Sequence, residues 1–63
     1  MYELHVYYPG EPRARLTERV RRAAEALDGI SRLLAAHRGC ERIVVMLSGL
    51  RLFSVDCAGN RLP

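Results

Sequence analysis

The chain contains little cysteine, no lysine and no long apolar run. Its two cysteines, Cys40 and Cys57, are too few for the disulfide framework of a small secreted domain. No apolar segment approaches the roughly 20 residues that a membrane-spanning helix needs. The first residues, MYELHVYY, show no basic segment followed by an apolar one, so they do not read as a signal peptide. A cytoplasmic, reducing location without membrane contact is therefore expected.

The length and composition indicate one small globular domain spanning residues 1–63, of which 49% are apolar. A chain of this size buries only about 60% of its unfolded surface, so disulfides, a metal or oligomerisation usually add stability. All ten basic residues are arginine, and the formal net charge is +3. That balance permits an acidic or nucleic-acid partner without requiring one.

The first half of the chain predicts one strand followed by one helix. Residues 2–8 alternate between apolar and polar side chains, which is typical of a strand with one buried face, and Pro9-Gly10 ends it. From about Pro12 to Arg38, apolar residues recur at spacings of three and four, which predicts an amphipathic helix. Asp28-Gly29 predicts a kink or a tolerated weak point in that helix.

The second half predicts a hairpin over residues 42–57, with a two-residue turn at Ser48-Gly49. Neither strand has a polar face. With strict alternation, the side chains facing the helix are Leu4, Val6, Ile43, Val45, Leu47, Leu50 and Leu52. The uncovered side carries Tyr7, Val44, Met46, Phe53 and Val55. Residues 58–63 form a turn and a short tail.

These elements predict an α+β fold of βαββ form, with one helix packed on one face of a three-stranded sheet. A right-handed connection between the first two strands is expected. With the strands numbered along the chain, their order across the sheet is either 1-2-3 or 1-3-2. The second is favoured, as a split βαβ unit in which every neighbouring pair is antiparallel.

The uncovered apolar patch is the main functional indication. Monomers rarely expose a contiguous apolar area above a few hundred Å2. The patch therefore predicts a homodimer or higher homo-oligomer, with a different protein partner as an alternative. No catalytic constellation is evident and no cofactor is expected, so the chain is interpreted as a small non-enzymatic interaction or accessory protein.

A nucleic-acid-binding module is a second, less favoured interpretation. Exposed sheet aromatics can stack on unpaired bases, and arginines can contact phosphates. The arginines in question are Arg15, Arg19, Arg22, Arg42 and Arg51. Arginines near the start of the predicted helix are also explained as a solvated face paired with glutamates.

A metal or thiol redox site is a third interpretation. His37, Cys40 and Cys57 are three candidate zinc ligands, although their spacing is looser than in most zinc sites. In the register of a two-residue turn, Cys40 lies opposite Cys57, where a disulfide is also geometrically conceivable. Otherwise the two cysteines act as small apolar residues.

Overall fold

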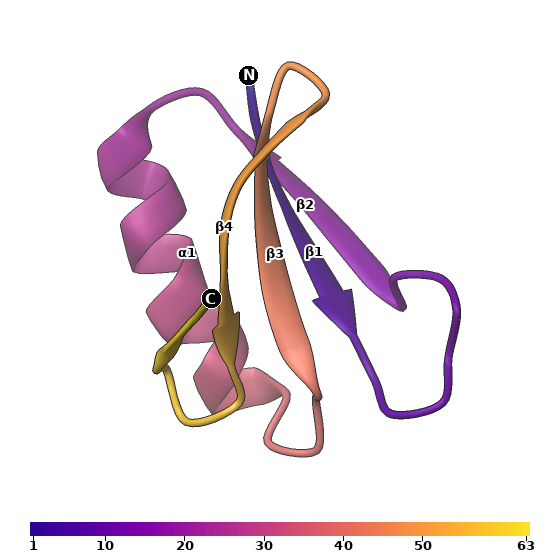
Figure 1. Cartoon of the computed structure of the whole chain (residues 1–63). Helices are drawn as coiled ribbons and strands as arrows, with labels where there is room; N and C mark the ends of the chain where they lie inside the picture. The colour runs from indigo at the N-terminus through magenta and orange to yellow at the C-terminus, as the bar shows by residue number, and fades with distance from the viewer.

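One antiparallel sheet and one helix make up the fold in the computed structural model, which describes residues 1–63. Along the chain the elements are β1 (Tyr2–Tyr7), β2 (Leu16–Val20), α1 (Ala23–Ala36), β3 (Arg42–Leu47), β4 (Leu50–Asp56) and β5 (Arg61–Leu62). The five strands lie in the order β2-β1-β3-β4-β5 (Figure 1). The predicted α+β class is confirmed, but the sheet has five strands instead of three.

Strand β2 replaces the first part of the predicted helix. Residues 12–15 belong to a loop, β2 pairs with β1, and α1 begins only at Ala23. Leu16 and Val20 are four residues apart, which is about one helical turn but also an even number of strand positions. They therefore share a face in either structure. The apolar spacing alone did not separate the two, and the prediction of a helix starting at Pro12 is wrong.

The order of the strands also differs from the favoured prediction. Strand β1 lies between β2 and β3 and is antiparallel to both, so β2 and β3 run in the same direction. The first hairpin strand, β3, is thus the neighbour of β1, and the 1-3-2 order is wrong. A split βαβ unit does exist, but β2 and β3 are its halves, because the extra strand reverses the chain before α1 begins.

The β3–β4 hairpin has the predicted two-residue turn. Leu47 pairs with Leu50, and both Ser48 and Gly49 have positive φ, 49° and 84°. Two positive φ angles define the primed turn that suits the twist of hairpin strands.

A β-bulge then breaks the alternation along β4. Val45 pairs with Phe53 while Met46 pairs with Arg51, so Leu52 has no partner of its own. From Phe53 onward the side chains point to the opposite faces from those that strict alternation predicts. Phe53 and Val55 consequently pack with the residues under the helix.

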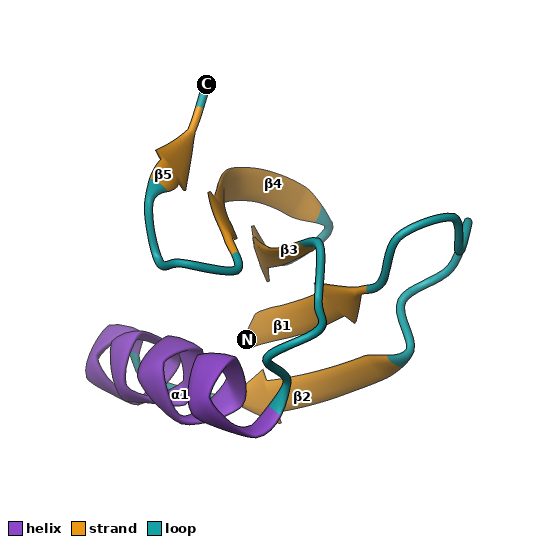
Figure 2. Ribbon diagram, turned by 90° about the horizontal axis from the view of Figure 1, so that it is seen from below, coloured by secondary structure: helices purple, strands orange, loops and turns teal.

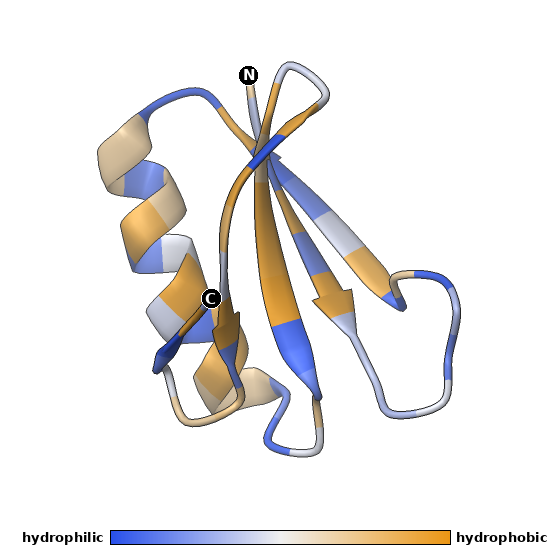
Figure 3. Cartoon of the chain, in the orientation of Figure 1, coloured by the Kyte–Doolittle hydropathy of each residue, from blue (hydrophilic) through white to orange (hydrophobic).

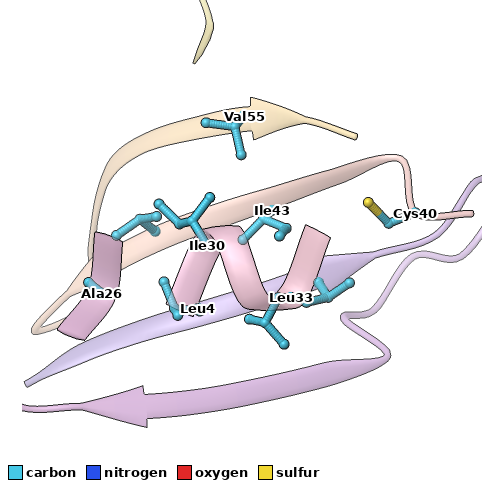
Figure 4. Packing of buried hydrophobic residues seen from close by; sticks show 9 residues of the cluster. Leu4, Ala26, Ile30, Leu33, Cys40, Ile43 and Val55 are labelled. Atoms are coloured by element: carbon cyan, nitrogen blue, oxygen red, sulfur yellow. The ribbon is translucent and has the colours of Figure 1, made fainter. Parts of the chain in front are cut away.

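The core lies between α1 and one face of the sheet (Figures 2 and 4). Its buried members are Leu4, Val6, Ala26, Ile30, Leu33, Cys40, Ile43, Val45 and Val55. The predicted core positions Leu50 and Leu52 are instead 72% and 45% exposed. The bulge moves Phe53 and Val55 toward the core and leaves Leu52 without a partner, whereas Leu50 keeps its predicted pairing with Leu47 and is exposed beside the turn.

Helix α1 is continuous through the predicted weak point. Gly29 is buried, and a Cβ atom built there would lie 2.6 Å from Leu4 Cδ1. The glycine therefore allows the helix to lie close to β1 without a break. With 14 residues, α1 is not long and apolar enough to cross a membrane.

Candidate interaction surface

The five residues predicted to form an uncovered patch do not share one face. Tyr7, Val44 and Met46 lie on the side of the sheet away from the helix, whereas Phe53 and Val55 pack with the core. Val44 is itself only 8% exposed in a single copy. The patch as predicted is therefore divided by the bulge in β4.

Polar side chains cover part of the outer face, which is the side of the sheet away from the helix. His5 Nε2 donates to Glu3 at 2.9 Å, and Arg19 Nε lies 3.2 Å from the same carboxylate. The hydrogen bond from His5, followed by the charge of Arg19, lowers the pKa of Glu3 despite some desolvation. Arg42 lies over the ring of Tyr7 with its Cζ 4.2 Å from the ring centroid. Strands β1 and β2 thus present charged and hydrogen-bonded side chains on this face.

A different group of apolar side chains surrounds the β3–β4 turn, with Met46 on the face away from the helix and Leu50 on the face of its partner Leu47. Leu50, Met1 and Leu52 are 72%, 56% and 45% exposed, and the side chain of Met46 is half-buried on β3. Ser48 N donates to Met1 O at 3.3 Å, which holds the first residue beside the turn. Figure 3 shows hydrophobic colouring on both strands next to this turn. We call Met1, Met46, Leu50 and Leu52 the apolar tip.

The apolar tip includes an open strand edge. Strand β5 pairs only with Ser54 and Val55, so residues 50–53 of β4 have a strand neighbour on one side alone. The other sheet edge, β2, carries Glu18 and Arg19, and charges on an edge discourage further pairing. Residues 50–53 contain one charged side chain, Arg51, between apolar neighbours. The edge of β4 is therefore the less protected of the two.

Sequence reasoning found only part of this surface. Met46 was predicted to be uncovered, but Leu50 and Leu52 were assigned to the core, and Met1 was not considered. The excess of apolar residues in β4 was visible in the sequence. The bulge that leaves Leu52 without a cross-strand partner has no separate signal in the sequence.

The five candidate arginines do not form one surface. Arg15 precedes β2, pairs with Glu11 and lies over Tyr8, whereas Arg19 lies on β2 and Arg22 immediately precedes α1. The side chain of Arg42 pairs with Glu41, and Arg51 lies on β4. Arg15, Arg19 and Arg22 were expected near the start of the predicted helix, and that expectation is wrong because α1 begins only at Ala23.

The predicted metal ligands lie in one region but make other contacts. His37 Nδ1 is 2.7 Å from Tyr8 Oη, and Cys57 Sγ donates to Arg38 O at 3.0 Å. No group of three or more histidine, cysteine, aspartate or glutamate side chains is arranged to hold a metal ion. The metal interpretation of His37, Cys40 and Cys57 therefore has no geometric support.

The surface has no pocket. No protein-family model, curated protein or solved structure matches the chain. The apolar tip and the open edge of β4 are therefore the features of this surface best suited to binding.

Proposed function

We propose that this chain is a small non-enzymatic interaction protein that associates with itself through the apolar tip and the open edge of β4. One observation carries the proposal: Leu50 and Leu52, 72% and 45% exposed, lie on a strand segment that has an unpaired edge. An exposed apolar edge strand is a template for pairing with another strand. The sequence-based expectation of self-association is kept, but its surface moves from the middle of the sheet to this end.

A second copy is the best-matched occupant of the edge. Antiparallel pairing about a two-fold axis brings the same segment of both copies together. With the axis between Arg51 and Leu52, Leu50 of each copy faces the other copy's Phe53, and Arg51 faces Leu52. This register keeps the two arginines from facing each other, and like charges directly opposite destabilise a strand pair.

The expected affinity is modest. Complete burial of a leucine contributes about 1.5–3 kcal/mol, and both leucines are already partly covered in one copy. Four such side chains and a few strand hydrogen bonds together are comparable to the roughly 4–15 kcal/mol that association costs in lost freedom. Association is therefore expected to be weak, with a dissociation constant closer to millimolar, about −4 kcal/mol, than to micromolar, about −8 kcal/mol.

Sedimentation velocity at concentrations up to about 1 mM tests the proposal under reducing conditions. The wild-type chain should show a reversible monomer–dimer equilibrium, and Leu50→Glu or Leu52→Glu should weaken it at least about tenfold, because each change places a charge in the apolar contact. Leu27→Glu is the matched control, since Leu27 is 61% exposed on α1. It should leave the equilibrium unchanged.

Two outcomes oppose the proposal. A wild-type chain that stays monomeric throughout the concentration range would remove self-association and leave a different protein partner as the alternative. Equal weakening by Leu27→Glu and Leu52→Glu would show association through another surface.

A further inference from the structure

The two cysteines lie together at one end of the core. Cys40 is in the connection between α1 and β3 and is 6% exposed, whereas Cys57 follows β4 directly and is half-buried. Cys40 belongs to the buried cluster, and Cys57 packs against that cluster. Figure 4 shows the Cys40 side chain at the end of the core. Residues 17 positions apart in the chain are thus brought to one place by the hairpin.

Hydrogen bonds connect the two residues. The carbonyl oxygen of His37 accepts from Cys40 N at 3.0 Å and from Cys57 Sγ at 3.5 Å. The shared carbonyl of His37 holds the two residues near each other. Burial raises the pKa of the Cys40 thiol to about 11, and its hydrogen bond with Cys57 contributes to the rise. Cys57 is thus the more accessible of two neighbouring thiols, and Cys40 is the protected one.

We propose that Cys40 and Cys57 form a reversible intramolecular disulfide, which makes this end of the core a site of thiol oxidation by small-molecule disulfides. Both thiols are free in the structure, so it represents the reduced form. The inference is independent of the proposed self-association, because the pair and the apolar tip lie at opposite ends of β4. It extends the sequence-based alternative of a thiol redox site and dispenses with a metal.

The reaction with oxidised glutathione is balanced in two exchanges. The Cys57 thiolate attacks one sulfur of the small disulfide, the bond between its sulfurs breaks, and one glutathione thiolate leaves. Cys40 then loses its proton and attacks Cys57 Sγ, so that the protein disulfide forms and the second glutathione leaves. The protein loses two electrons and two protons, and one oxidised glutathione becomes two reduced molecules.

The bridge links the α1–β3 connection to the end of β4. It closes a loop that contains β3 and β4, and this restricts the unfolded chain. Oxidation also removes the thiol proton that Cys57 donates to the carbonyls of His37 and Arg38. The net expectation is a melting temperature about 10 °C higher in the oxidised form, since the restriction of the unfolded chain is the larger effect.

Equilibration of the purified chain in glutathione buffers of graded potential tests the site. Intact mass should fall by about 2 Da without a glutathione adduct, and the melting temperature should rise with the oxidised fraction. Cys40→Ala should retain one glutathione on Cys57 because nothing displaces it. Cys57→Ala should remain largely unmodified, as Cys40 is buried.

The same titration in urea shows whether the fold favours the pair. The folded chain should have an effective thiol concentration at least about tenfold above that of the unfolded chain, since the fold already holds the sulfurs together. Equal values, or disulfides that form between chains in place of the internal one, would overturn the proposal. So would a wild-type chain that keeps both thiols in fully oxidised buffer.

Discussion

At the scale of single residues, Gly29 shows how close packing can reverse a local preference. Glycine in a helix interior costs about 1 kcal/mol relative to alanine, so propensity alone predicts that Gly29→Ala stabilises the protein. The added Cβ would lie 2.6 Å from Leu4 Cδ1, and Leu4 is fully buried. Overpacking of this kind costs about 1–3 kcal/mol. We therefore expect a net loss of about 1 kcal/mol, measured by urea unfolding.

A second background tests the cause of that loss. Leu4→Val removes the Cδ atoms that the new methyl group meets, so Gly29→Ala should cost less, or become stabilising, in a Leu4→Val chain. Asp28→Ala is the neighbouring control on the exposed side of α1 and should change stability by less than about 0.5 kcal/mol. A more stable Gly29→Ala protein in the wild-type background would contradict the packing argument.

At the scale of elements, β2 and α1 are joined by the ion pair of Glu18 and Arg32. The hydrogen bond from Arg32 lowers the pKa of Glu18, with the arginine charge adding to the effect against some desolvation. The folded pKa is below the unfolded one. The pair's stabilisation is therefore present above the unfolded pKa and is lost as the pH falls through the folded value.

The pair thus predicts a specific acid dependence. As the pH falls below the usual pKa of glutamate, the free energy of unfolding of the wild-type chain should decline. Part of this decline should be absent in Arg32→Gln, where Glu18 loses its partner. The effect should be small because the Arg32 side chain is 58% exposed. Chemical unfolding at a series of acidic pH values measures it, and Arg38→Gln is a control that leaves the pair intact. Parallel curves for wild-type and Arg32→Gln chains would argue against this contribution.

The same elements show how far the sequence could predict the fold. Alternation located β1, the Ser48-Gly49 turn located the hairpin, and three-four spacing located α1 from Ala23 onward. Strand β2 was missed because Leu16 and Val20 fit both periods. Its strand character depends on pairing with β1, which is a long-range contact that local spacing does not encode.

The candidate surface was less predictable than the elements. An apolar excess on the hairpin indicated that some side chains must remain uncovered, and Met46 was among those identified. Which others remain uncovered depends on the bulge at Leu52, since one extra residue exchanges the two faces for the rest of β4. Phe53 and Val55 were assigned to the wrong face for that reason, whereas Leu50 keeps its predicted pairing with Leu47 and is exposed beside the turn.

At the scale of the whole molecule, the core is small. Only 12 of 63 residues are buried, and a domain of this size is marginally stable by itself. Binding to the folded state alone adds stability by mass action. If the apolar tip is an interface between copies, the protein's stability must depend on its own concentration.

Thermal unfolding across a hundredfold range of protein concentration tests this link between association and stability. As the concentration rises toward the range in which the wild-type chain dimerises, its melting temperature should rise by up to about 5 °C, because unfolding releases two chains. Leu52→Glu should show a constant melting temperature, whereas Leu27→Glu should follow the wild type. A reducing agent keeps Cys40 and Cys57 unlinked, which separates this effect from that of an internal disulfide. Identical, concentration-independent melting of the wild-type and Leu52→Glu chains would show that the apolar tip contributes no stability through association.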